Sequence, residues 1–304
     1  MERYDVIIIG GGPAGLTAGM YVARARLNVL LLEAAVPGGN AALTDRIENY
    51  PGFPFGISGP DLMDQFRIQA ERFGLQIKMS QVTGLEVTAA GKKVVTPEGA
   101  YLAPVVIIAS GVRRQELGVP GEAELAGRGV SYCATCDGPF FEERKVAVVG
   151  GGDSAIEEAL YLSTLASTVY VIHRRDQLRA NRTTQEKALA NPKLQFKFNR
   201  VVERIMGEGK LNSLLLKDTV TGEKEELPVD GVFVSIGMKP AADFISGLTL
   251  RNGYIVTDEE MRTGVPGILA AGDIRYKTVR QVATAVGDGA IAGLTATRLL
   301  EESR

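Results

Sequence analysis

Histidine and cysteine are scarce in this chain of 304 residues, which has one histidine, two cysteines and no tryptophan. A structural zinc site needs more thiolate and imidazole ligands than these three residues supply, so we expect no bound metal. A secreted disulfide framework is also excluded, because such frameworks place many cysteines in a short chain. These counts are compatible with a nucleotide-binding protein.

The chain also lacks an excess of positive or negative charge, and it lacks a long apolar run. The chain has 34 basic and 36 acidic side chains, and nucleic-acid-binding domains need a basic face, so we expect no nucleic-acid partner. No apolar run approaches the about 18 residues of a membrane span, and residues 1–5 lack the start of a signal peptide. We therefore expect a soluble, cytoplasmic protein with no membrane contact, whose length suggests about two domains.

Glycine is abundant instead, with 36 residues, and two glycine motifs form an internal repeat. Residues 6–15 are typical of a buried strand that runs into a Gly-x-Gly-x-x-Gly turn. Residues 146–155 repeat the pattern 140 positions later (150 minus 10), with Ala155 in place of the last glycine. Each motif precedes a helical pattern and a second strand, which together form the βαβ unit of dinucleotide-binding domains. In this unit the glycines permit a tight turn, the approach of a pyrophosphate and close packing of the helix. The repeat therefore predicts two dinucleotide sites.

The ends of the two second strands distinguish these sites. Glu33 ends the first one, where a carboxylate accepts hydrogen bonds from a ribose 2′-OH and repels a 2′-phosphate. The residue 140 positions later is His173, which is followed by Arg174, Arg175 and Arg179. Guanidinium groups suit a 2′-phosphate, so this site is predicted to bind NADPH and the first one FAD. His173 lines the adenosine end or is purely structural; we assign it no catalytic role.

The two cysteines, Cys133 and Cys136, stand three positions apart shortly before the second motif. Such a pair can close a small disulfide that exchange reactions open again. Exchange needs a group that takes and gives a proton, and no second histidine exists to serve. Asp137 directly follows the pair and is the simplest candidate. We predict these three residues as catalytic; two unreactive buried cysteines are the alternative.

Over essentially its full length the chain resembles the low-molecular-weight thioredoxin reductases, the class II pyridine nucleotide-disulfide oxidoreductases. The motifs that carry the resemblance are Gly-Gly-Gly-Pro-Ala-Gly at 10–15, Glu-Asn-Tyr-Pro-Gly at 48–52, Cys-Ala-Thr-Cys-Asp at 133–137, Gly-Gly-Gly-Asp-Ser-Ala at 150–155, His-Arg-Arg-Asp-Gln-Leu-Arg-Ala at 173–180, Ala-Ala-Gly-Asp at 270–273 and Arg-Gln-Val-Ala at 280–283.

The resemblance implies an α/β fold with two Rossmann-like dinucleotide-binding domains, the NADPH domain inserted into the FAD domain. The FAD-binding domain would comprise residues 1–112 and 243–304. The NADPH-binding domain, with the Cys-x-x-Cys pair, would comprise residues 113–242. Short apolar strands that end in glycine, at 105–111 and 232–237, support these joints.

The site residues follow from the matching motifs. The resemblance assigns FAD contacts to Gly10, Gly12, Pro13, Ala14, Gly15, Glu33, Gly39, Asn40, Asn49, Gly111, Gly272, Asp273, Arg280, Gln281, Val282 and Ala283. It assigns NADPH contacts to Gly150, Gly152, Asp153, Ser154, His173, Arg174, Arg175 and Arg179.

The implied reaction passes a hydride from NADPH to FAD, then opens the Cys133–Cys136 disulfide, and ends by exchange with thioredoxin or a thioredoxin-like protein. The resemblance makes Cys136 the flavin-facing sulfur and Cys133 the sulfur that attacks thioredoxin; spacing alone does not assign this order. It further implies a homodimer and a rotation of the inserted domain that brings the dithiol and NADPH to the flavin in turn.

Three other functions stay open. A relative that takes electrons from ferredoxin, or one that serves a peroxiredoxin system, would share the dithiol. The arginines after His173 argue against ferredoxin, because ferredoxin-linked relatives lose the pyridine-nucleotide motifs. A non-catalytic flavin redox sensor is the third, since one fold hosts many functions.

Overall fold

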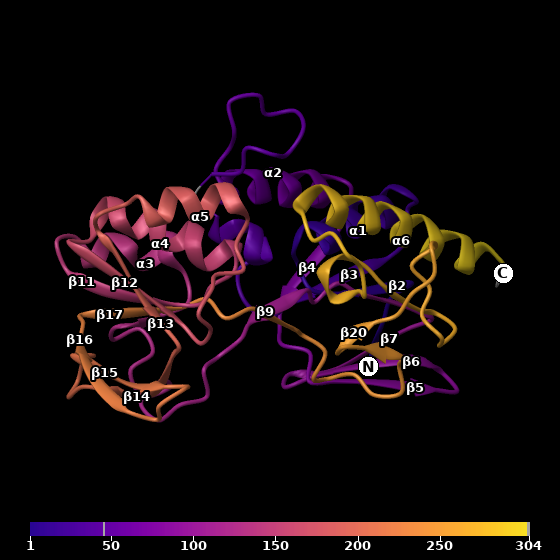
Figure 1. Cartoon of the computed structure of the whole chain (residues 1–304). Helices are drawn as coiled ribbons and strands as arrows, with labels where there is room; N and C mark the ends of the chain where they lie inside the picture. The colour runs from indigo at the N-terminus through magenta and orange to yellow at the C-terminus, as the bar shows by residue number, and fades with distance from the viewer. Residues whose placement is uncertain (45, 303–304) are drawn as a thin grey trace. The chain divides into compact units, whose positions relative to one another are not determined.

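The computed structural model describes residues 1–44 and 46–302. The chain is α/β and forms two compact units, Met1–Arg113 with Lys239–Arg304 (unit 1) and Arg114–Met238 (unit 2) (Figure 1). Unit 2 is thus inserted into unit 1, and the predicted fold class is confirmed. The crossings lie at 113/114 and 238/239, whereas the sequence-based division was at 112/113 and 242/243. At the crossings β9 (Val112–Arg114) and β18 (Met238–Pro240) pair as a two-stranded sheet.

Unit 1 is built on a five-stranded parallel sheet in the order β21-β8-β2-β3-β4. Its strands are β2 (Val6–Ile9), β3 (Val29–Glu33), β4 (Gln76–Met79), β8 (Val105–Ile108) and β21 (Ile268–Ala270). Strand β2 is buried throughout, as expected of a parallel strand covered on both faces. Val6 and Ile8 belong to one apolar cluster and Ile7 and Ile9 to another, because alternate side chains point to opposite faces.

Helices cover one face of this sheet and a second sheet covers the other. The helices of unit 1 are α1 (Pro13–Arg24), α2 (Gly59–Arg72) and α6 (Val282–Glu302), with 3-10 turns η1 (Gly39–Leu43) and η3 (Gly272–Ile274). The second sheet, in the order β1-β7-β6-β5, comprises β1 (Glu2–Arg3), β7 (Gly99–Ala103), β6 (Gly91–Thr96) and β5 (Gly84–Thr88). A short hairpin of β19 (Leu250–Arg251) and β20 (Tyr254–Ile255) completes the unit.

Helices α1 and α6 cross closely, and two glycines of α6 make this possible. A Cβ at Gly289 would lie 2.3 Å from the carbonyl oxygen of Ala14. A Cβ at Gly293 would lie 2.9 Å from that of Ala18. Larger residues at either position would push the helices apart.

Unit 2 repeats the plan with a parallel sheet in the order β10-β17-β11-β12-β13. The elements of unit 2 are β10 (Val130–Ser131), α3 (Ala134–Asp137), η2 (Gly138–Phe141), β11 (Lys145–Val149), α4 (Asp153–Leu165), β12 (Thr168–His173), α5 (Arg182–Leu189), β13 (Leu194–Phe198), β14 (Arg200–Met206), β15 (Ser213–Asp218), β16 (Lys224–Pro228) and β17 (Gly231–Val234). In Figure 1 the helices α3, α4 and α5 lie on one side of this sheet, and the antiparallel strands β14–β16 lie on the other.

The strand register shows that the repeat predicted from sequence is a repeat of structure. Val6 pairs with Val29 in unit 1, and Val146 pairs with Val169 in unit 2. Both pairs are therefore related by the same shift of 140 positions (146 minus 6 and 169 minus 29). Within residues 1–44 and 46–302, the helices are too short or too polar to cross a membrane.

Candidate functional site

The first glycine motif forms the turn between β2 and α1. Gly10 has φ +106°, and a Cβ there would lie 2.4 Å from the carbonyl oxygen of Ala109. A Cβ at Gly15 would lie 1.9 Å from the carbonyl oxygen of Gly10, so the helix packs directly on the turn. Gly12 precedes the helix and has open space where a Cβ would be, which leaves the helix N-terminus accessible to a phosphate. Pro13 and Ala14 form the first turn of α1.

Residues distant in sequence surround this turn. A Cβ at Gly39 would lie 3.3 Å from Gly12 Cα. Gly272 approaches Ala14 more closely still, since a Cβ at Gly272 would lie 2.8 Å from Ala14 Cβ. Asn40 donates through Nδ2 to the carbonyl oxygen of Val112 at 2.9 Å, next to Gly111. The fold thus gathers the FAD-assigned segments at one edge of the unit-1 sheet, where α/β proteins bind nucleotides.

Glu33 lies at the end of β3 beside this turn. Its Oε2 accepts the N–H of Gly11 at 2.6 Å, and its Oε1 accepts the N–H of Ala35 at 2.9 Å. Each oxygen keeps a second lone pair, so the carboxylate is oriented by the backbone and can still accept a hydroxyl.

A third part of unit 1 joins the loop after η1 to the start of α6. Asn49 donates through Nδ2 to Gln281 Oε1 at 3.0 Å, although the two residues are 232 positions apart. Helix α6 begins at Val282, so Arg280 and Gln281 directly precede it and Ala283 lies in its first turn. The Arg280 guanidinium stacks on the ring of Tyr254, 4.0 Å from its centre.

Asp273, in η3, is the most deeply placed acid of the FAD-assigned set. Its Oδ1 is buried and accepts no hydrogen bond from the described residues, although Lys277 Nζ pairs with it at 3.3 Å. Burial raises the pKa of Asp273, and the Lys277 ammonium opposes that rise. A buried carboxylate oxygen without a donor suits a ligand hydroxyl.

The second motif reproduces the first turn in unit 2. A Cβ at Gly150 would lie 2.3 Å from the carbonyl oxygen of Ser235, while Gly152 again faces open space before a helix, here α4. Asp153, the first residue of α4, accepts both the backbone and side-chain N–H groups of Asn181, at 2.7 and 2.8 Å. Ser154 follows in the first turn of α4 and is exposed.

The arginines of the second site stand at its rim. Arg174, Arg175 and Arg179 are exposed, and within residues 1–44 and 46–302 none of them pairs with a carboxylate. The Arg179 N–H donates to the carbonyl oxygen of Gly151 at 2.6 Å, so the arginine segment is tied to the glycine turn. These guanidinium groups can therefore meet a phosphate.

His173 is buried, with 5% of its surface exposed. Its Nε2 accepts or donates no hydrogen bond among the described residues. Burial lowers its pKa, and the positive charges of Arg179, Arg175 and Arg174 lower it further. Both effects favour the neutral imidazole, which packs against Gly151 of the second glycine turn.

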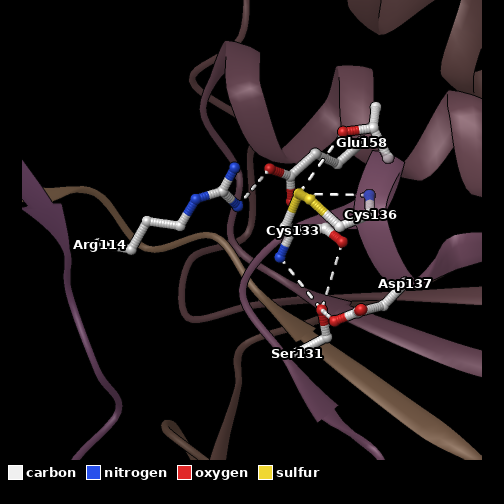
Figure 2. The surroundings of a disulfide bond; sticks show 7 residues. Arg114, Ser131, Cys133, Cys136, Asp137 and Glu158 are labelled. Atoms are coloured by element: carbon white, nitrogen blue, oxygen red, sulfur yellow. Dashed lines mark hydrogen bonds and ion pairs between the residues drawn. A yellow bond between two sulfur atoms is a disulfide. The ribbon is translucent and has the colours of Figure 1, made fainter. Parts of the chain in front are cut away.

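The two cysteines form a disulfide at the start of α3 (Figure 2). Cys133 Sγ accepts the N–H of Cys136 at 3.2 Å. Asp137 accepts the hydroxyl of Ser131 through Oδ2 at 2.6 Å, and the same hydroxyl oxygen accepts the N–H of Cys133 at 3.1 Å. Ser131 therefore connects the predicted proton carrier to the disulfide.

Cys136 is the more exposed cysteine, and Cys133 is only partly exposed. Exposure alone favours Cys136 as the sulfur that meets a partner, whereas the hydrogen bond to Cys133 Sγ favours Cys133 as a thiolate. The two observations point in opposite directions, so the roles of the sulfurs stay predictions.

Sequence reasoning missed three residues of this site. Ser131, Arg114 and Glu158 all lie around the disulfide in Figure 2. Arg114 donates through Nη1 to Glu158 Oε1 at 2.8 Å. Ser131 stands two residues before Cys133 and could have been noticed as a neighbour, but the other two are brought there only by the fold.

The family model of the pyridine nucleotide-disulphide oxidoreductases matches residues 4–289. A thioredoxin reductase of Listeria innocua is 49% identical over 302 residues, which cover 98% of this chain and 94% of that protein. The solved thioredoxin reductase of Lactococcus lactis aligns with a TM-score of 0.90 at 45% identity, covering 98% of this chain and 99% of the other. A ferredoxin-flavin thioredoxin reductase of Clostridium acetobutylicum aligns less well, with a TM-score of 0.56 at 33% identity over 99% of each chain. The chain therefore belongs to the pyridine nucleotide-disulphide oxidoreductase family and, within it, to the thioredoxin reductases, as its motifs predict.

Proposed function

We propose that this chain is a flavoenzyme that uses FAD and NADPH to reduce the disulfide of thioredoxin or a thioredoxin-like protein. The observation that carries the proposal is the Cys133–Cys136 disulfide, which lies in the same unit as a second glycine turn with exposed arginines at its rim. By resemblance to the family, we further propose that it acts as a cytoplasmic homodimer.

The residues of unit 1 fit FAD. The N-terminus of α1, open in front of Gly12, would hold the pyrophosphate, and Glu33 would accept the adenosine ribose hydroxyls. The buried Oδ1 of Asp273, which pairs with Lys277 at 3.3 Å, would also accept a hydroxyl of the ribityl chain. The start of α6, held by the Asn49–Gln281 hydrogen bond, would place helix N–H groups near a reduced isoalloxazine, whose negative charge they stabilise.

The residues of unit 2 fit NADPH. The open space before Gly152 would receive the pyrophosphate, and the exposed Arg174, Arg175 and Arg179 would bind the 2′-phosphate. An adenine or ribose would then rest near the neutral imidazole of His173.

When bound, the flavin supplies a two-electron relay between NADPH and the disulfide. The protein's own part begins at Cys133, whose sulfur the Cys136 N–H stabilises as a thiolate. This thiolate attacks a sulfur of the partner's disulfide, and the partner's other sulfur leaves with the electron pair. Cys136 then attacks Cys133 of the mixed disulfide, which restores Cys133–Cys136 and releases the partner as a dithiol. Asp137, oriented by Ser131, exchanges the protons with the sulfurs.

Electron supply by ferredoxin is the second candidate, because a ferredoxin-flavin enzyme is among the similar structures. The exposed Arg174, Arg175 and Arg179 argue against it, since a ferredoxin-driven enzyme has no 2′-phosphate to bind.

Stopped-flow mixing of the oxidised holoenzyme with NADPH, NADH or reduced ferredoxin separates these candidates. We expect rapid flavin bleaching with NADPH alone, followed by turnover when thioredoxin is added. Bleaching only by ferredoxin would reject the assignment, and equal bleaching by NADH would reject the role of the arginines. Cys136→Ser should keep the bleaching and lose thioredoxin reduction.

A further inference from the structure

A carboxylate outside the predicted catalytic set points towards the disulfide in Figure 2. The side chain of Glu158, in α4, is 15% exposed. Its Oε1 accepts the Arg114 guanidinium, but its Oε2 is buried and makes no hydrogen bond with any described residue. Figure 2 shows this carboxylate directed towards the disulfide, on the side away from Asp137 and Ser131.

Helix packing holds Glu158 in this place. The CxxC segment packs on α4, because a Cβ at Gly138 would lie 3.1 Å from the Tyr161 ring and 3.2 Å from Leu162. Glu158 is thus presented by the helix against which the CxxC segment packs.

The charged groups that face Glu158 come from several elements. Burial raises its pKa most, and Glu157 on the same helix adds to the rise. Arg114 from β9 lowers that pKa, and so does the Ser235 hydroxyl, after β17, which lies near the carboxyl without forming a hydrogen bond to Oε2. The carboxyl of Asp137 lies across the disulfide, where Ser131 engages it. The net effect on Glu158 is a raised pKa in a site that also holds one guanidinium.

A buried carboxylate oxygen without a hydrogen-bond donor is unfavourable by about 1–3 kcal/mol. The oxidised disulfide has no hydrogen to donate. Reduction adds two electrons and two protons, breaks the S–S bond and leaves two S–H groups on the side towards which this carboxylate points. The missing donor therefore arises in the reaction itself.

We propose that Glu158 holds the reduced dithiol in its protonated form, with Oε2 accepting the hydrogen of one thiol while Arg114 retains Oε1. The inference rests on the proposed function only in requiring that this disulfide be reduced during turnover. The negative charge of Glu158 then opposes the ionisation of one of the two thiols, and the positive charge of Arg114 favours that ionisation.

Thiol titration tests this without thioredoxin or NADPH, so its failure is distinct from failure of the proposed function. The flavin-loaded single-thiol variants Cys136→Ser and Cys133→Ser are reduced with dithiothreitol, desalted and alkylated with iodoacetamide from about pH 6 to pH 10. Adding Glu158→Gln should lower the pKa of at least one remaining thiol by about one unit. Adding Arg114→Gln should raise it, and Glu158→Asp should shift it less than Glu158→Gln.

The matched control is Glu203→Gln, which removes a carboxylate paired with Lys224 in the three-stranded sheet of the same unit. It should leave both thiols unchanged. If the role of Glu158 were purely structural, Glu158→Gln and Arg114→Gln would not move the thiol pKa in opposite directions. Unchanged titration of both thiols in Glu158→Gln overturns the proposal. If that variant fails to retain flavin, an Arg114→Gln thiol pKa that is unchanged or lower overturns it instead.

Discussion

The imidazole of His173 packs directly on Gly151, where a Cβ would lie 2.3 Å from Nδ1. At the corresponding place in unit 1, the Gly11 N–H donates to Glu33 Oε2 at 2.6 Å. The two copies therefore use one geometry, in which the residue at the end of the second strand contacts the middle glycine of the turn. One copy makes the contact with a carboxylate and the other with a neutral ring.

Gly151→Ala should destabilise unit 2, because the new methyl group must displace a buried ring. We expect a loss of about 1–3 kcal/mol in unfolding free energy, measured by denaturant titration. The matched control is Gly11→Ala, whose methyl would lie 3.1 Å from the movable end of Glu33 and should cost less. Equal losses in the two variants would contradict the packing described here.

The titration of His173 can be measured directly, because it is the only histidine of the chain. Burial and three arginines lower its pKa, so the midpoint of its imidazole proton resonance should lie below about 6.5. The unfolded chain then binds more protons in that interval, and stability contributed by the neutral ring is present above the unfolded pKa and lost as pH falls below it. A midpoint at or above the ordinary value would refute the assignment of a neutral ring.

Replacing Arg174, Arg175 and Arg179 together by glutamine should raise the KM for NADPH by about tenfold or more. Hydrogen bonds to charged groups contribute about 1.5–3 kcal/mol each, and a tenfold change corresponds to about 1.4 kcal/mol. The KM for NADH should change little, since NADH lacks the 2′-phosphate. Arg204→Gln, an exposed arginine of the same unit, is the control and should leave both constants unchanged.

Two glycines of α6 should respond to alanine with opposite signs. Gly289→Ala places a methyl 2.3 Å from a backbone oxygen of α1 and should lower the Tm. Gly287→Ala meets open space and should raise stability by about 0.5–1 kcal/mol through helix propensity. Calorimetry of the two holoenzymes checks this pair, and a stabilised Gly289→Ala would disprove the close crossing.

Much of the fold follows from the sequence because its main signals are local. Gly10 and Gly150 act within turns of a few residues. At each position a Cβ would clash with a backbone carbonyl oxygen, as the motif predicts. The shift of 140 positions relates the residues of the motifs and therefore the strand registers as well.

Contacts between segments that are distant in the sequence could not be predicted from local sequence patterns. Nothing in the neighbourhood of Asn49 indicates Gln281 as its partner, because the contact arises from the packing of the loop after η1 on the start of α6. In the sequence, Glu158 is one of two adjacent glutamates in the segment that forms α4. Its importance depends on burial and on Arg114, which the strand β9 brings to it from 44 positions away.

The insertion of unit 2 has a consequence for the chain as it leaves the ribosome. Strand β8 needs β21 as its outer neighbour and α1 needs α6, yet β21 and α6 are translated only after all of unit 2. Unit 2 is continuous and has its own core, so it can fold while its host still lacks one sheet edge and a covering helix. Unit 1, although first to emerge, is thus the last to close.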